Sequence, residues 1–234
     1  MKKKNVKAVA IAVILMFIFP GVTFAGGMFG PLQTISKKEG GLNTGIGYLR
    51  HEDKFENGGT YVVKQNQVYT QAGYGAGDLW EIYGRFGMSD MEIGSFEDNM
   101  KNFFGTLGGK IYYPYSQAFG IGVFVQGTYF FSDFTGLVPG TATEIKIRDM
   151  WDANFGIGIQ ATLPCGTRLY AGPFVYYSEA EVSHPASKST ISNRTAAGGF
   201  AGIDMPLGKG FRLNLETQFS DRFSAGAAVT FTYF

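Results

Sequence analysis

Side chains of the kinds used most often in catalysis are few in this chain. Its 234 residues include two histidines, His51 and His184, and one cysteine, Cys165. Ser183 directly precedes His184, but neighbouring residues of a strand point to opposite faces, so these two side chains are poorly placed to act as nucleophile and base. A single cysteine cannot form an internal disulfide, and no histidine lies near it in the sequence. We therefore predict that the protein is not an enzyme and that it has no cofactor and no metal site.

Charged side chains recur at every second position of several segments whose other positions are apolar. In residues 144–163 one parity includes Phe155 and Ile157, whereas the other includes Arg148 and Asp152. An alternation of period two is typical of a strand with one apolar and one polar face. We expect the polar faces to enclose one lumen and to form an ion-pair network there. The predicted members of this network are Glu81, Arg85, Lys110, Arg148, Asp152, Arg168, Arg194, Arg212 and Glu216.

The elements that position these side chains are predicted to be ten strands. The chain contains 34 Gly, about twice the average usage, and 16% of its residues are aromatic. Aromatic residues favour strands, and Gly disfavours helices, so this composition argues against a helical bundle. The predicted strands are residues 42–50, 68–75, 80–88, 103–113, 119–132, 144–163, 167–178, 192–204, 211–219 and 223–234.

The first 25 residues are predicted to be a cleaved secretory signal peptide. Basic residues from Lys2 to Lys7 precede an apolar run from Val9 to Phe19, and Ala25 ends a small-x-small cleavage site. This apolar run is about half the length of the roughly 20 residues that a membrane-spanning helix needs. The domain organisation is therefore predicted as a signal peptide (1–25), a periplasmic N-terminal segment (26–40) and a barrel (41–234).

The composition after residue 25 excludes two classes of protein. Four of the 20 Lys and Arg residues lie in the signal peptide, so 16 remain against 19 Asp and Glu, a net charge of −3. This mildly acidic charge excludes a basic nucleic-acid surface, and we expect no nucleic-acid partner. No window of 18 apolar residues occurs there either, which excludes a bundle of membrane-spanning helices.

Two architectures use amphipathic strands of this kind. A soluble barrel or sandwich hides the apolar face, whereas a transmembrane barrel turns it toward lipid. Here the polar face is rich in Gly and in balanced charge, which suits a narrow lumen, and aromatic residues gather near strand ends, as girdles do at the two membrane interfaces. We therefore predict an all-β fold, a transmembrane antiparallel up-and-down β-barrel of ten strands, with eight strands as the alternative. The expected girdle residues are Tyr48, Tyr74, Trp80, Tyr113, Phe119, Tyr129, Phe131, Trp151 and Tyr177.

The connections between the predicted strands alternate between long and short. The long ones are residues 51–66, 89–102, 133–143 and 179–191, and only the last link, 220–222, departs from the alternation. Because bacterial barrels have short periplasmic turns and longer outer loops, both chain ends are expected on the periplasmic side, and both histidines in outer loops.

The chain ends with Thr230-Phe231-Thr232-Tyr233-Phe234, an amphipathic strand with a terminal aromatic residue. With the signal peptide and the strand pattern, it resembles the opacity-protein and OmpA-type group of small barrels from double-membraned bacteria. The resemblance implies a place in the outer membrane, among its lipid and lipopolysaccharide, and recognition of Phe234 by the barrel-assembly machinery. Phe234 departs from the group in phase, because it falls on the polar parity of the last strand.

Three functions are compatible with this sequence. We expect a barrel with an envelope-structural, surface-interaction or solute-passage role, whose lumen is filled by the charged network and whose loops could bind an extracellular ligand. One alternative is a narrow channel for small polar solutes, lined by the same charges. The other is a rim-active enzyme, either lipid A-modifying or an omptin-like protease. Residues 26–40 either form a periplasmic tail or enter the lumen.

Overall fold

The computed structural model describes most of the chain after the predicted signal peptide. It covers residues 27–34, 41–56, 60–76, 79–93, 100–137, 144–184, 187–192, 196–220 and 223–233. The predicted signal peptide and Phe234 lie outside the described residues. Within these ranges no helix is long and apolar enough to cross a membrane. The strands are β1 (Gly41–Glu56), β2 (Thr60–Ala76), β3 (Trp80–Ile93), β4 (Met100–Pro114), β5 (Phe119–Phe130), β6 (Phe134–Leu137), β7 (Glu144–Thr162), β8 (Arg168–His184), β9 (Ser187–Ser192), β10 (Ala196–Gly208), β11 (Phe211–Phe219) and β12 (Phe223–Thr232).

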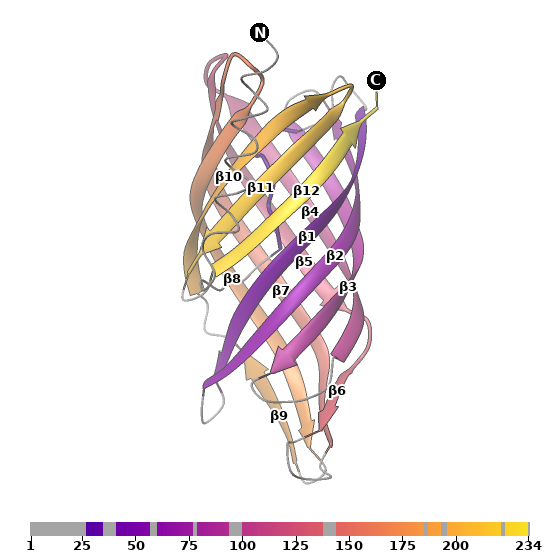
Figure 1. The fold of residues 1–234 in the computed structure, drawn as a ribbon. Helices are drawn as coiled ribbons and strands as arrows, with labels where there is room; N and C mark the ends of the chain where they lie inside the picture. Colours follow the sequence, from indigo (N-terminus) through magenta and orange to yellow (C-terminus); the bar gives the residue numbers. More distant parts are fainter. Residues whose placement is uncertain are drawn as a thin grey trace, which may run out of the picture.

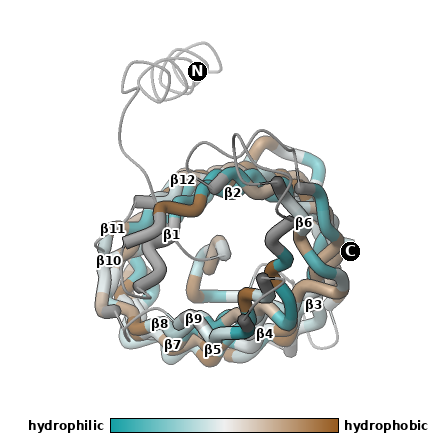
Figure 2. The backbone as a smooth tube through the Cα atoms, turned by 90° about the horizontal axis from the view of Figure 1, so that it is seen from below, coloured by the Kyte–Doolittle hydropathy of each residue, from teal (hydrophilic) through white to brown (hydrophobic). Residues whose placement is uncertain are grey.

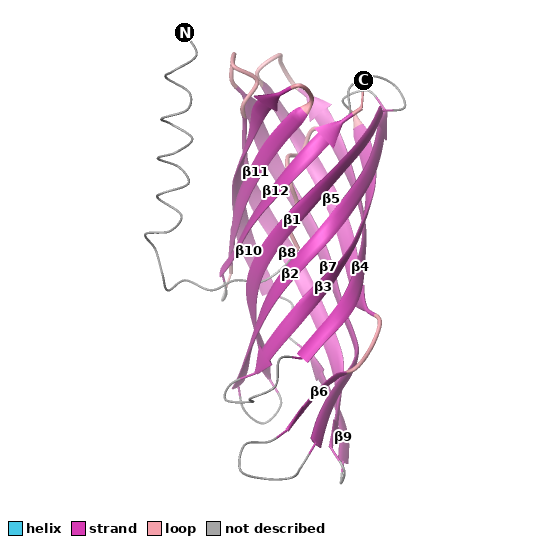
Figure 3. Ribbon diagram, turned by 45° about the vertical axis from the view of Figure 1, so that its right-hand side comes forward, coloured by secondary structure: helices cyan, strands magenta, loops and turns pink. Residues whose placement is uncertain are grey.

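The strands close into an antiparallel barrel (Figure 1). β1 pairs with β2 on one side and with β12 on the other, so that Gly47 lies opposite both Tyr69 and Ala228. Consecutive strands pair around the rest of the wall, where β5 pairs with β7 and β8 with β10. β6 and β9 are short additions to β7 and β8 that protrude beyond the wall at one end (Figure 3). The predicted ten-stranded up-and-down barrel is confirmed, and its closure leaves no open edge among the wall strands.

Apolar side chains point away from the lumen along most of the wall, as the alternation predicts. In β7, Phe155, Ile157 and Ile159 are exposed, whereas Asn154 and Gln160 are buried. The fully alternating burial pattern of β5 shows the same arrangement over twelve residues. Seven of the nine predicted girdle residues are exposed, and the rings of the other two, Trp151 and Tyr177, pack together with centroids 5.3 Å apart.

A β-bulge in β7 reverses this alternation toward the end of the barrel where β6 and β9 lie. The register with β8 shifts between Arg148 and Trp151, and Asp149 adopts a positive φ of 47°. As a result Ile147 is buried inside the barrel, although the sequence pattern placed it on the lipid-facing parity. Arg148 is turned out of the lumen by the same shift and forms a half-exposed ion pair with Asp133 at 3.0 Å. The prediction that Arg148 belongs to the lumen network is therefore wrong.

The start of β1 and the C-terminal end of β12 lie at the end of the barrel with the short turns. The turn between β7 and β8 spans only five residues, and Tyr233 N donates a hydrogen bond to Leu42 O at the start of β1. The long loop predicted over residues 51–66 is mostly strand, because β1 continues to Glu56 and β2 resumes at Thr60 with Glu56 opposite it. This hairpin extends the wall beyond the region that apolar alternation marks.

The interior holds two layers of buried apolar side chains. One layer lies in the half of the barrel nearer β6 and β9. It combines residues from β2 to β8, namely Val63, Tyr69, Met91, Phe104, Phe130, Phe134, Ile147, Met150 and Ala180. The other layer includes Phe29 and Leu32, which precede the barrel, packed against wall residues such as Tyr170 and Phe200. Inward glycines make room for these rings, because a Cβ atom at Gly202 would lie 2.2 Å from the Tyr170 ring.

Candidate functional site

Residues 27–34 lie inside the barrel and not in the periplasm. Figure 2 shows this segment within the ring of strands. The side chains of Met28, Phe29, Leu32 and Thr34 are at most 1% exposed. We call residues 27–34 the lumenal segment. Of the two positions left open by the sequence for residues 26–40, the described part occupies the lumen.

Phe29 anchors the lumenal segment in an aromatic pocket. Its ring centroid lies 4.1 Å from that of Phe124, 5.1 Å from that of Phe174 and 5.3 Å from that of Phe200. The contacts to Phe174 and Phe200 are edge-to-face, a favoured geometry for aromatic pairs. The pocket therefore combines β5, β8 and β10, three strands on one side of the wall.

Glu216 binds the main chain of the lumenal segment. Its Oε1 atom accepts a hydrogen bond of 2.7 Å from Phe29 N, and its Oε2 atom accepts one of 2.7 Å from Gly30 N. Tyr170 donates its hydroxyl to the same carboxylate at 2.9 Å, and Gln218 donates its side-chain amide at 2.8 Å. Hydrogen bonds to an ionised acceptor are about twice as strong as neutral ones, so this carboxylate is a firm attachment point.

Cationic and amide side chains bind the carbonyl groups of the segment. Arg85 Nη1 donates to Met28 O at 2.5 Å, and Lys110 Nζ donates to Pro31 O at 2.9 Å. The Arg85 guanidinium also lies over two rings, 4.9 Å from the centroid of Tyr69 and 4.8 Å from that of Tyr83. These donors satisfy carbonyls that would otherwise be buried without a partner.

Two glutamines bind the described start of the segment. Gly27 O accepts hydrogen bonds from Gln126 Nε2 at 3.1 Å and from Gln218 Nε2 at 2.8 Å. A third glutamine, Gln160, exchanges side-chain and main-chain hydrogen bonds of 3.2 Å with Gln33 near the other end. The segment is therefore bound along its whole described length.

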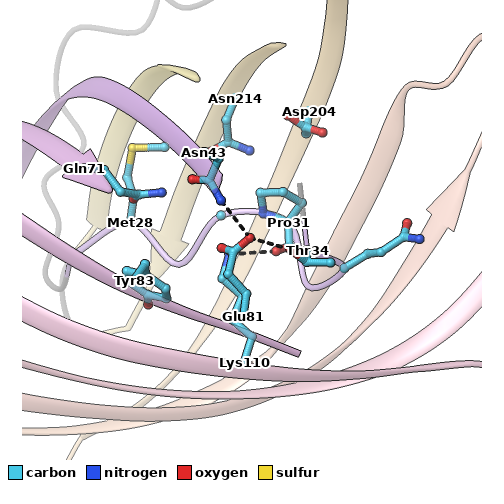
Figure 4. A network of polar contacts seen from close by, with 12 residues as sticks. Met28, Pro31, Thr34, Asn43, Gln71, Glu81, Tyr83, Lys110, Asp204 and Asn214 are labelled. Atoms are coloured by element: carbon cyan, nitrogen blue, oxygen red, sulfur yellow. Dashed lines mark hydrogen bonds and ion pairs between the residues drawn. The ribbon is translucent and has the colours of Figure 1, made fainter. Parts of the chain in front are cut away.

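Thr34 connects the segment to the end of the lumen near the short turns. Its hydroxyl donates to Glu81 Oε2 at 2.7 Å, and Asn43 Nδ2 donates to the same oxygen at 3.2 Å (Figure 4). Lys110 Nζ lies 3.5 Å from Glu81 Oε1, and these two residues are direct register partners of β3 and β4. The pair is almost fully buried, so each charge depends on the other for compensation.

A second charge cluster surrounds Asp204 on β10. Arg212 Nε lies 2.6 Å from Asp204 Oδ2, and Arg168 Nη1 lies 3.8 Å from the same atom. Arg168 also donates to Thr34 O at 3.3 Å, which connects this cluster to the lumenal segment.

Six of the nine predicted network residues meet in the lumen around this segment, and three do not. The six are Glu81, Arg85, Lys110, Arg168, Arg212 and Glu216. Asp152 is half-buried on β7, where it accepts a hydrogen bond from Asn154 at 2.7 Å. Arg148 pairs with Asp133 outside the lumen, and Arg194 lies outside the described residues. Gln126, Gln160 and Gln218 were not predicted, although all three fall on the polar parity of their strands.

The candidate catalytic residues do not come together. His51 is buried in β1, where its ring is hydrogen-bonded to Gln65, so its predicted place in an outer loop is wrong. His184 ends β8, and its side chain is not described. Cys165 is exposed in the turn between β7 and β8. In the described ranges, His, Cys, Asp and Glu side chains form no group of three that could hold a metal ion.

A closed antiparallel wall with an apolar outer surface and a polar, aromatic interior is the architecture of outer-membrane β-barrel proteins, and this chain has that fold. No protein-family model and no curated protein matches it. The translocator domain of the autotransporter NalP from Neisseria meningitidis is similar over 97% of this chain and 96% of its own, with a TM-score of 0.51 and 12% identity. An outer membrane channel from Pseudomonas putida F1 is similar over 89% of this chain and 99% of its own, with a TM-score of 0.50 and 9% identity. At these identities the likeness concerns the fold.

Proposed function

We propose that the protein is an outer-membrane channel for small solutes, closed by its own lumenal segment. The observation that supports this most is the way the segment is bound. Side chains of β3, β4, β5 and β11 reach its main chain through hydrogen bonds, and those of Arg85, Lys110 and Glu216 are charge-assisted. If the segment left, the same side chains would line a polar passage.

The chemistry of the wall favours a removable segment over a permanent core. Buried charges are weak stabilisers compared with well-packed apolar side chains of the same size. A lumen needed only for stability would therefore be served better by apolar residues than by the Glu81–Lys110 and Asp204–Arg212 pairs. We propose that these charges are kept because solutes and water contact them when the segment is released.

Location and partners belong to the same proposal. The signal-peptide pattern, the two aromatic girdles and the apolar outer wall support residence in the outer membrane, in contact with its lipid and lipopolysaccharide. We further propose assembly by the barrel-assembly machinery, through a C-terminal strand of the opacity-protein and OmpA type. A non-enzymatic role is supported by the burial of His51, which is 6% exposed and hydrogen-bonded to Gln65.

Single-channel recording in planar bilayers tests the channel. The wild-type protein should be closed for most of the time, and Phe29→Ala should raise the open fraction at least tenfold because it empties the aromatic pocket. Thr106→Ala is the matched control. The Thr106 hydroxyl is buried in the lumen, lies 2.9 Å from the Thr128 hydroxyl and makes no described contact with the lumenal segment. Equal open fractions of the wild-type and Phe29→Ala proteins, both correctly folded, would overturn the channel proposal.

A further inference from the structure

We propose that the lumen is a binding site for short peptides that carry an aromatic side chain, and that the lumenal segment occupies this site in cis. The inference rests on the proposed function insofar as the segment must leave before another peptide can enter. It adds a ligand class, which channel activity alone does not specify.

The site recognises a peptide main chain as such. Glu216 accepts hydrogen bonds from two successive N–H groups, whereas Arg85 and Lys110 donate to carbonyls. Gln126 and Gln218 converge on a further carbonyl, that of Gly27. None of these contacts is made by a side chain of the segment, so another peptide can make them if it has glycine at the position of Gly30, whose φ is 73°. Buried donors and acceptors placed at the spacing of a main chain favour peptides over ligands without amide groups.

Selectivity comes from the pockets that receive the segment's side chains. Phe29 fills the ring pocket of Phe124, Phe174 and Phe200 described above, which fits any aromatic side chain at that position. Met28 lies against Gly226, where a Cβ atom would be 2.5 Å from the Met28 sulfur. Large side chains on the wall would close these pockets, so the inward glycine on β12 is part of the site.

The lumen also has a small space beside the segment. A cavity of about 20 Å³, enough for about one water molecule, is lined by residues of the segment and by wall residues that include Lys110, Asp204 and Asn214. Asp204 Oδ1 and Asn214 Oδ1 are buried and have no hydrogen-bond partner among the described residues. One water molecule in this cavity, or a donor from a bound peptide, would satisfy them.

The covalent link between segment and barrel sets the conditions for a test. A tethered ligand has an effective concentration of about a millimolar or more, so a free peptide competes poorly with the wild-type segment. Phe29→Ala removes the anchoring ring of the segment and leaves every wall residue in place. The full-length Phe29→Ala protein is therefore the right receptor for an added peptide.

The experiment measures binding of a fluorescent nine-residue peptide with the sequence of residues 26–34 to this Phe29→Ala protein in detergent micelles. We expect saturable binding, at least tenfold weaker for the same peptide with Ala in place of its Phe, and a further loss of at least tenfold when Glu216→Ala is added to the receptor. Adding the lipid-facing substitution Leu107→Ala instead should leave binding unchanged. Heat-modifiable gel migration checks that each barrel is folded.

Two results would overturn the inference: equal binding of the Phe and Ala peptides, or no binding of either. Should Phe29→Ala leave the segment seated, a receptor that lacks residues 27–34 repeats the titration, and the same two results apply. Conductance separates the two proposals. A barrel that binds the Phe peptide but never conducts refutes the channel alone, whereas one that conducts without binding the peptide refutes the peptide site alone.

Discussion

Glu216 and Phe29 are 187 residues apart in the sequence, yet the carboxylate of Glu216 accepts a hydrogen bond of 2.7 Å from the backbone N–H of Phe29. The contact joins β11, one of the last strands of the barrel, to the segment that precedes the first. It is possible only once the wall has closed, because Glu216 then points into a lumen that the segment has entered. The closure of the barrel and the binding of its N-terminal segment are therefore linked.

Glu216→Gln should weaken the attachment of the lumenal segment. The substitution removes the negative charge and turns one acceptor oxygen into a donor, so at least one of the hydrogen bonds from Phe29 N and Gly30 N is lost. The expected cost is about 1.5–3 kcal/mol of segment binding, the range for hydrogen bonds to charged groups. Single-channel open probability measures it. Glu92→Gln, at an exposed position of β3, is the matched control and should change nothing.

Lys110→Met should destabilise the barrel more than the double substitution Glu81→Gln/Lys110→Met. The single change leaves the buried Glu81 carboxylate without its cation, at a cost of about 3–5 kcal/mol, whereas the double change removes both charges. Urea unfolding in detergent or lipid vesicles gives the free energies for a double-mutant cycle. A Lys110→Met variant as stable as the double variant would contradict the cost assigned to the unpaired Glu81 carboxylate.

Gly122→Val should expel the segment from the lumen. A Cβ atom at this position of β5 would lie 2.8 Å from Leu32 Cβ, too close for the two to coexist. We expect an open channel, and closure should return when Leu32→Gly removes the clashing atom. Gly127→Val serves as the control on the same strand, since its Cβ atom would point outward and meet nothing nearer than 3.6 Å. Failure of Leu32→Gly to restore closure would count against a steric cause.

Cys165 should react only with maleimides that reach the membrane face on which the short turns lie. The reaction should also begin at a lower pH than that of an ordinary thiol. Hydrogen bonds from the side chain and backbone of Thr167 lower the pKa of the Cys165 thiol. At the same pH, a larger fraction of Cys165 than of a free cysteine is therefore thiolate. Thr167→Ala should shift the pH profile of the alkylation rate upward. Labelling of intact cells without permeabilisation would contradict the proposed orientation, in which this turn is periplasmic.

The fold could be predicted because its signal is local. Period-two alternation in segments such as residues 119–132 reports which side chains face lipid, and turn residues such as Pro164 and Gly166 mark where the strands reverse. Ten such strands then imply a closed barrel, in which the first and last strands pair, because an open sheet edge is not tolerated in hydrocarbon. The same signal failed where local geometry interrupts it, at the bulge around Asp149 and in the hairpin that continues beyond His51.

The sequence by itself predicted ten strands with eight as the alternative, the lipid-facing side of most strands, and nine network residues that include the six charged residues found in the lumen. Only the tertiary structure decided what fills that lumen. The lumenal segment has no alternation or motif of its own, and its partners include residues of β3, β4, β5, β7, β8, β10 and β11, up to 191 residues away. Their convergence depends on the curvature and register of the closed wall. No local pattern of residues records those two properties, because they arise from the pairing of all ten strands at once.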